Sequence, residues 1–331
     1  MTTEKSTEEL ETKDLEAREV PHDLVSGGLA DKVSLTPEGV TDEVGVVIPM
    51  WRQRVRIFMH NKLAIASVVY LVLVTLFCFF WPHLHPTNQT NQNLALTQPF
   101  NAPPSSTHPL GTDSNGFDVL GRIAFGGEYS LTVGFLAGVV TIIVGTIYGM
   151  VSGFVGGVVD TVLMRVLDAA LSIPLLFLLI TLVTLFSRSA TFLILLIGLT
   201  GWFGNARIVR GDALLIRRLE YSQAATAMGA SKWHIIRRHV FPNSISNIVT
   251  VGTFSVADAI LFLSTLGFLG LGIQPPNTDW GTMLQNGSDQ IANGYWWEIY
   301  PLAAIFILVV VAINYIGDAL RDAFEVRLIE R

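Results

Sequence analysis

The sequence of 331 residues has a single cysteine, few charged residues (15%) and no Gly-Lys dipeptide. Because Cys78 has no second cysteine to pair with, an intrachain disulfide is excluded. The missing Gly-Lys excludes a phosphate-binding loop of the GxxxxGK[ST] type, so any ATP hydrolysis must occur on another chain. The motifs HExxH and GxSxG and any Cys/His cluster with metal spacing are also absent. We therefore predict no catalytic site, no metal site and no cofactor on this chain.

Charge is concentrated at the N-terminus, where residues 1–50 hold 12 acidic and 4 basic side chains and no aromatic residue. Such a segment buries too little apolar surface to offset the entropy lost on ordering, so we expect a disordered tail. It also lacks the basic and apolar regions of a cleavable signal peptide. Residues 51–331, with 15 acidic and 17 basic side chains, are nearly neutral.

Half of the residues are apolar, and they gather in six long continuous runs. A bilayer core of about 30 Å is crossed by roughly 20 apolar residues in a helix. Continuous runs favour helices over a barrel, whose strands would alternate. We predict an all-α integral membrane protein with six transmembrane helices at about 63–81, 129–151, 166–186, 190–209, 245–272 and 299–317.

The distribution of Lys and Arg predicts the orientation of these spans, because basic residues are enriched in cytoplasmic segments. With the N-terminus inside, 15 basic residues lie on the inner side and two, Arg122 and Arg188, on the outer side. Both termini are then cytoplasmic, and the outer loops lie near 82–128, 187–189 and 273–298.

A polar, basic segment at 220–243 interrupts the apolar runs and must lie in water on the cytoplasmic side. Ala224, Ala225 and Gly229 remove side-chain bulk from one surface, which allows another protein to approach the backbone. Gly229 can end a first helix because it tolerates positive φ. Ser231 is then the expected N-cap of a second helix. That helix is predicted to end at Pro242.

The second helix is also amphipathic, with Trp233, Ile236 and Val240 on one face. It could therefore grip anionic lipid instead of a protein. The alanine and glycine surface favours protein docking, because lipid binding would favour larger apolar residues.

The segment 220–243 resembles the coupling loop of bacterial ABC-transporter permeases, specifically the C-type subunit of dipeptide/oligopeptide permeases. The residues that carry this resemblance are Ala224, Ala225, Gly229, Ala230, Ser231, Arg238, His239, Pro242 and Asn243. Gln223 stands where the family usually has Glu, and Glu220, one helical turn earlier, is a candidate replacement.

Three other stretches are similar to the same family in the expected order: 59–71, 108–134 and 266–284. Within them, Phe117 replaces a usual Arg, and Trp280, Gly281 and Met283 match the family's outer loop. The resemblance implies a type I ABC importer permease (MetI-like) fold in the bacterial cytoplasmic (inner) membrane. It also implies an outer-face contact of these three residues with a substrate-binding protein.

The partners implied by the family are a homologous second permease, two ATPase subunits or domains that bind ATP and Mg, an extracytoplasmic substrate-binding protein and the lipid bilayer. No nucleic-acid partner is expected. We divide the chain into the acidic tail 1–50, a region 51–128 with the first span and outer loop, a transmembrane domain 129–323 that contains the coupling loop, and a cytoplasmic C-terminus 324–331.

Asp258 lies near the middle of the fifth predicted span, where a carboxylate should face a cavity or a partner. Two roles are open: a residue of the translocation path or a structural pair with the second permease. The family commonly has Glu five residues later, where this chain has Leu263.

Arg165 and Asp168 are spaced for an ion pair on one helix. Gly134, Gly138, Gly145 and Gly149 form a small-residue stripe suited to close helix packing, with packing between permease subunits as an extension.

The main functional hypothesis is the permease subunit of an ATP-driven importer of dipeptides or oligopeptides. A secondary transporter driven by an ion gradient is the alternative, although such proteins usually carry inverted repeats and several intramembrane charges. A membrane-embedded hydrolase would need a nucleophile and a base at membrane depth. Nickel or another small solute remains a possible substrate within the family.

Overall fold

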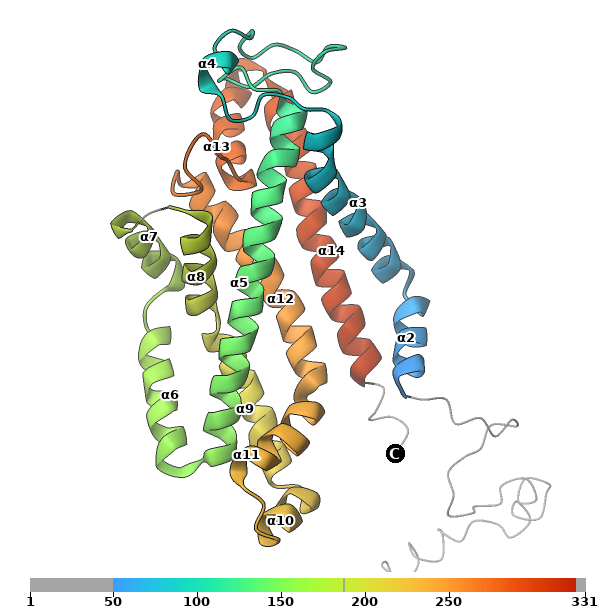
Figure 1. The fold of residues 1–331 in the computed structure, drawn as a ribbon, viewed down its shortest axis with the longest axis vertical. Helices are drawn as coiled ribbons and strands as arrows, with labels where there is room; N and C mark the ends of the chain where they lie inside the picture. Colours follow the sequence, from blue (N-terminus) through green and yellow to red (C-terminus); the bar gives the residue numbers. More distant parts are fainter. Residues whose placement is uncertain (1–49, 187, 326–331) are drawn as a thin grey trace, which may run out of the picture. The chain divides into compact units, whose positions relative to one another are not determined.

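The computed structural model describes residues 50–186 and 188–325, and the regular elements in these ranges are helices. Figure 1 shows long helices running side by side, with α10 and α11 at the opposite end from α4 and α13. The predicted tail 1–50 and C-terminus 324–331 lie almost wholly outside the described residues. The helices are α2 (Met50–His60), α3 (Lys62–Leu84), α4 (Gln92–Ala95), α5 (Val119–Val155), α6 (Gly157–Leu171), α7 (Leu175–Leu185), α8 (Ala190–Gly201), α9 (Phe203–Arg217), α10 (Glu220–Ala227), α11 (Lys232–Ile235), the π-helix η2 (Ile236–Val240), α12 (Phe241–Phe268), α13 (Trp280–Gln290), the short 3₁₀ helices η3 (Ile291–Asn293) and η4 (Trp296–Glu298), and α14 (Tyr300–Glu325).

Within the described part of the chain, four helical segments are long and apolar enough to cross a membrane. They are α3, α5, the continuous segment Lys232–Phe268 and the segment Trp296–Phe324. Two further pairs, α6 with α7 and α8 with α9, have the composition of a span but are bent by 77° and 44°. The prediction of an all-helical membrane protein is therefore confirmed, with four to six candidate spans.

The third and fourth predicted spans are not straight helices. The third run, expected at 166–186, breaks between α6 and α7, because Pro174 lacks an amide hydrogen and disfavours helical geometry at Ile173. The fourth run, expected at 190–209, breaks at Trp202, and α9 then continues to Arg217.

The fifth span begins earlier than expected, and the prediction that the basic helix ends at Pro242 is wrong. Helical backbone continues from Lys232 through η2 and α12 to Phe268. Pro242 therefore lies inside a continuous helix, and the irregular π-helical turn η2 directly precedes this residue without an amide hydrogen. The basic segment and the membrane helix are thus one mechanical unit.

Helix α5 is the central packing element, and its glycines explain why. Gly134 and Gly138 face Ile260 and Val256 of α12. Nearer the C-terminal end of α5, a Cβ added at Gly149 would lie 2.5 Å from the Ala206 carbonyl oxygen of α9. The small-residue stripe therefore packs α5 against helices of its own chain, which corrects its predicted extension to packing between permease subunits.

Candidate functional site

The segment 220–243 forms a helix, a tight turn and a second helix at one end of the bundle (Figure 1). Gly229 follows α10 with φ +84°, and its amide donates to the Thr226 carbonyl at 3.0 Å. The Ser231 hydroxyl oxygen accepts a hydrogen bond from the His234 amide at 3.2 Å, which caps α11. The Gly229 turn and the Ser231 cap are therefore placed as predicted.

The inner surface of this segment packs against its own chain. Ala225, Ile235, Ile236 and Val240 are buried together with side chains of α5 and α9, including Phe154. Ala225 therefore cannot belong to an external docking surface, which corrects part of the predicted alanine face. The prediction of one apolar face is also wrong for Trp233, because its side chain is 65% exposed while Ile236 and Val240 are buried.

The outer surface presents small and apolar residues to solvent. Ala224, Ala227 and Gly229 are exposed, and the Met228 side chain between them is 83% exposed. No described atom would lie within 4 Å of a Cβ added at Gly229. We call this set, with Trp233, the docking surface.

The polar residues of the segment divide between internal and external roles. Gln223 is exposed, and its amide donates to the Arg218 carbonyl at 3.0 Å. Glu220 is exposed at the start of α10, so a carboxylate is available one turn from the position of Gln223. Arg238 is exposed, whereas the His239 ring lies beside that of Tyr221 with centroids 5.6 Å apart.

A cleft of about 670 Å³ opens beside the docking surface. Its lining includes the cationic side chains of Arg217, Arg218 and Lys232 and contains no carboxylate. A partner that carries acidic side chains next to a compact apolar contact would fit this combination.

Two ion pairs hold α9, the helix that leads into the segment, against α6. The Arg210 guanidinium donates to both carboxylate oxygens of Asp160 at 2.6 Å, and the Ser152 hydroxyl donates to the same carboxylate at 2.5 Å. Arg207 pairs with Asp168. The predicted pair between Arg165 and Asp168 is therefore wrong, because Asp168 turns to a neighbouring helix. Sequence spacing could not indicate pairs between residues that lie about 40 to 50 positions apart.

Asp258 lies on α12 with an exposed side chain, while Ala257 and Ala259 beside it are buried. No hydrogen bond or ion pair joins Asp258 to another residue in the described ranges. The carboxylate thus points away from the chain's own core, which both predicted roles require. Leu263 is fully buried among apolar side chains. Its position therefore provides no carboxylate and no surface that a substrate or partner could contact.

The predicted outer-face contact residues lie inside the protein, and we correct that prediction. Trp280 is fully buried, Gly281 is buried, and Met283 is 8% exposed. The Trp280 indole donates to the Ile123 carbonyl at 3.0 Å, and its amide donates to the Ser130 hydroxyl at 2.9 Å. These residues fasten α13 to α5 and cannot present a surface to another protein.

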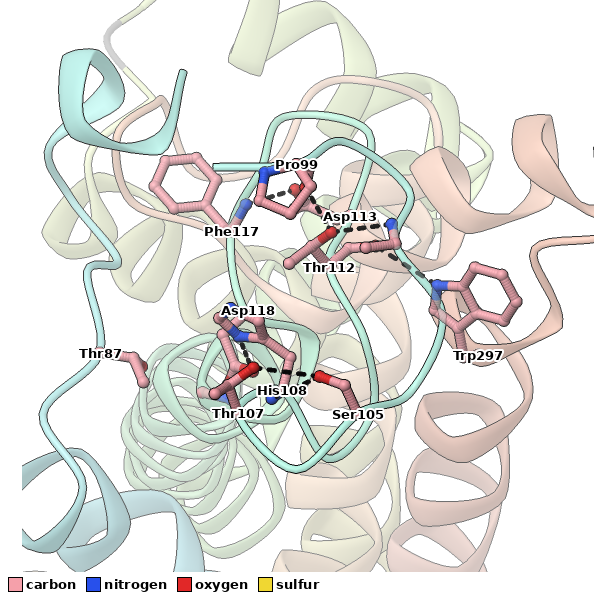
Figure 2. Close-up of polar contacts among 12 residues, drawn as sticks. Thr87, Pro99, Ser105, Thr107, His108, Thr112, Asp113, Phe117, Asp118 and Trp297 are labelled. Atoms are coloured by element: carbon pink, nitrogen blue, oxygen red, sulfur yellow. Dashed lines mark hydrogen bonds and ion pairs between the residues drawn. The ribbon is translucent and has the colours of Figure 1, made fainter. Parts of the chain in front are cut away.

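A hydrogen-bonded cluster that sequence reasoning missed organises the outer loop (Figure 2). Asp118 caps α5 by accepting from the Gly121 amide at 2.7 Å, and its other carboxylate oxygen lies 3.0 Å from the His108 ring nitrogen. Nearby, the Trp297 indole donates to the Thr112 carbonyl at 3.3 Å. An aspartate just before a long apolar helix is a capping signal, so Asp118 could have been identified.

Two other residues show how the outer side is built. Phe117, which stands where the resembled family has Arg, places its ring 4.3 Å from the Arg122 guanidinium in a cation–π contact. Asp279 caps α13 and is fully buried. Burial raises the pKa of the Asp279 carboxyl, and hydrogen bonds from Ile273 and Thr282 oppose this rise.

Comparison with known proteins gives two family matches. Residues 142–330 match the model of the binding-protein-dependent transport system inner membrane component. Residues 49–104 match the N-terminal TM domain of oligopeptide transport permease C.

Individual relatives cover most of the chain. The oligopeptide transport system permease protein OppC of Escherichia coli (strain K12) is 39% identical over 90% of this chain and 98% of its own length. The dipeptide transport system permease protein DppC of Bacillus subtilis (strain 168) is 38% identical over 81% of this chain and 83% of its own. The glutathione transport system permease protein GsiD of Pectobacterium atrosepticum is 34% identical over 84% of this chain and 91% of its own.

Proposed function

Because this chain belongs to the family of binding-protein-dependent transport system inner membrane components, we propose that it is the permease subunit of an ATP-driven importer of peptides. Dipeptides or oligopeptides are the proposed substrates, since several relatives are named for the transport of these classes. The bacterial cytoplasmic membrane is the proposed location.

The proposed topology has six spans with both termini in the cytoplasm, each bent pair counting as one crossing. The excess of basic residues on the inner segments supports it, as does the common position of α10, α11 and the lower end of α14 at one end of the bundle (Figure 1). We retain the divisions 1–50, 51–128, 129–323 and 324–331 as part of this proposal.

The partners follow from the class of transporter. A second permease completes the membrane channel, two ATPase subunits bind ATP and Mg²⁺, and an extracytoplasmic binding protein delivers the substrate. This chain supplies no ATP site of its own in the proposal, and no nucleic acid takes part. We propose that the binding protein contacts exposed residues of the outer loops, since Trp280, Gly281 and Met283 are internal.

The observation that carries the proposal is the docking surface beside a basic cleft. Residues without bulky side chains at Ala224 and Gly229 allow an ATPase subunit to approach the backbone closely. The cations of the cleft provide complementary charge for acidic side chains on that subunit.

A displacement of the docked ATPase would be transmitted to the membrane helices through two rigid connections. The inner face of the segment, with Ile235 and Val240, packs in one buried apolar cluster with the ends of α5 and α9. In addition, α11, η2 and α12 form continuous helical backbone into the bilayer. Displacement of the docking surface would therefore shift α12, and with it Asp258.

Cysteine cross-linking in the assembled transporter tests the docking. Ala224→Cys places a thiol on the docking surface, whereas Ala225→Cys places one on the buried side of the same helix and serves as the matched control. The native Cys78 is buried and far along the chain. We expect a short bifunctional reagent to join the Ala224→Cys variant, and not the Ala225→Cys variant, to the ATPase subunit. Absence of a cross-link from the Ala224→Cys variant, with the complex intact, would refute docking at this surface.

A bulky substitution tests the same surface by function. Gly229→Trp should abolish transport and retention of the ATPase while the protein remains inserted. Gly294→Trp is the control for retention of the ATPase alone, because Gly294 also has positive φ (+86°) and open space around it, but lies in an outer loop. Normal transport by the Gly229→Trp variant would contradict the docking model.

A further inference from the structure

A small cavity lies where the loop before α5, the first turn of α5, α13 and η4 meet. It has a volume of about 20 Å³ and is lined, among the described residues, by Asp113, Val119, Arg122, Met283, Asn286 and Glu298. A cavity of this size has room for about one water molecule. The charged groups that line it are therefore screened by little solvent.

Glu298 brings a carboxylate without a counter-ion into this cavity. The residue is 4% exposed, and its Oε1 atom is buried without a hydrogen-bond partner in the described part of the chain. The Ser114 amide faces the carboxylate and favours its ionised form. No ion pair joins Glu298 to a cation in the described ranges. An ionised Glu298 would thus be a buried, unpaired charge, which is unfavourable.

Asp113, the second carboxylate of the cavity, is better stabilised as an anion. Its Oδ1 atom accepts from the amides of Asn115 and Phe117 at 2.9 and 2.8 Å. Burial raises the pKa of the Asp113 carboxyl, and these two hydrogen bonds and the nearby charge of Arg122 oppose the rise. Asp113 therefore keeps the negative charge, and repulsion between like charges favours a neutral Glu298.

The other titratable groups on the surrounding elements lie outside the cavity lining. They are His108 and Asp118, which pair with each other; Glu128, beside Cys78 further along α5; Asp279, which caps α13; Asp289, which accepts from Gln285; Tyr295, beside the Trp297 ring; and the exposed Tyr300. The Arg122 guanidinium donates to the carbonyls of Gln89 and Pro276 at 2.6 and 3.1 Å. None of these contacts supplies Glu298 with a cationic partner.

We propose that Glu298 binds a proton in this packing and that release of the proton loosens the outer joint, which consists of residues 111–117, α13 and η4. The joint is closely packed, since a Cβ added at Gly287 of α13 would lie 2.9 Å from the Glu298 carbonyl oxygen. Trp297, the neighbour of Glu298, donates to the Thr112 carbonyl at 3.3 Å (Figure 2). A displacement of η4 would therefore reach the loop directly.

In the proposed topology the outer joint faces the external medium, so external pH would adjust the surface that is available to the binding protein. This consequence rests on the proposed function, whereas the proton site does not.

Hydrogen–deuterium exchange of the purified full-length chain in lipid nanodiscs tests the inference. The closed joint binds one proton more than the opened joint, so the opening equilibrium constant should rise with pH, by up to about tenfold per pH unit. Glu298→Gln has the size of the protonated acid and cannot ionise, so it should lack this dependence. The ratio of wild-type to variant exchange over residues 111–117 cancels the intrinsic effect of pH, and it should rise between about pH 5 and about pH 8.

Two further variants separate the site from a general loss of charge. Asp289→Asn removes an exposed carboxylate of α13 and should exchange like the wild type at each pH. Asp113→Asn keeps an oxygen acceptor for the Asn115 and Phe117 amides but removes the like charge, so the pH dependence should weaken. If Glu298→Gln does not elute as a monodisperse protein, this second variant still provides the test.

Infrared difference spectra between the two pH values measure the proton itself. The wild type should lose a protonated carboxyl band, and Glu298→Gln should not. An exchange ratio that is independent of pH, an equal change in Asp289→Asn, or a wild type that releases no carboxyl proton over this range would each overturn the inference. Neither measurement uses transport, so failure of the proposed function would not alter the result.

Discussion

At the scale of single residues, Trp280 shows how a family-matching residue can be structural. Its indole is fully buried between α13 and α5 and donates to the Ile123 carbonyl. A tryptophan of this kind stabilises the protein through its large buried area and one satisfied donor. The position is therefore explained without any external ligand.

We predict that Trp280→Ala destabilises the protein by about 3–5 kcal/mol, as expected for a large buried aromatic side chain. Trp280→Phe should cost less, because it keeps a buried ring and loses only part of the volume and the donor. Unfolding by SDS in mixed micelles measures both changes. A Trp280→Ala variant of normal stability that fails to engage the binding protein would restore the role in external contact.

Asp258 is the second residue with a testable role. If its carboxylate lines the path of the peptide, Asp258→Asn should reduce uptake while the purified complex remains intact. If it pairs with a cation of the second permease, the same change should leave that cation unpaired and weaken co-purification of the two subunits. Normal uptake together with normal assembly would exclude both roles.

At the scale of helices, the α6–α9 contact offers a matched comparison. Both ion pairs join the same two helices, but the Asp160 and Arg210 side chains are 16% and 30% exposed, against 47% and 52% for Asp168 and Arg207. A half-buried bidentate pair should be stronger than an exposed one.

Double-mutant cycles with Asp→Asn and Arg→Gln should therefore give a coupling of about 1–2 kcal/mol for Asp160–Arg210. The coupling for Asp168–Arg207 should be below about 1 kcal/mol. Reversible unfolding in mixed micelles supplies the four free energies of each cycle. Equal couplings would show that burial does not distinguish the two pairs.

The helices also show what the sequence could predict and what it could not. Apolar runs located every candidate span, since length and hydropathy are local properties, and Gly229 and Ser231 located the turn and cap at 220–243. The 77° bend before Pro174 was missed because a continuous apolar run masks a break in direction. The buried positions of Ala225 and Trp280 depend on helices distant in sequence, so a motif alone could not separate an internal from an external face. The same limit applies to Asp160 and Arg210, whose spacing carries no signal.

At the scale of the whole molecule, much of the apolar surface remains uncovered in the described chain. Between 22% and 50% of each candidate span's apolar window is buried within it. Lipid and a second permease are the natural environments for the remainder. The exposed carboxylate of Asp258 and the exposed docking surface also call for a neighbouring subunit or another environment outside this chain. Neither has a partner within the described ranges.

The most direct test of the central claim is peptide uptake into proteoliposomes that contain this chain, its second permease, the two ATPase subunits and the binding protein. We predict uptake of labelled di- or oligopeptides that requires ATP and Mg²⁺ and stops when the ATPase subunits are omitted. The Gly229→Trp variant should reduce uptake to the level seen without ATP. Uptake driven by an ion gradient in the absence of the ATPase subunits would contradict the account and identify a secondary transporter.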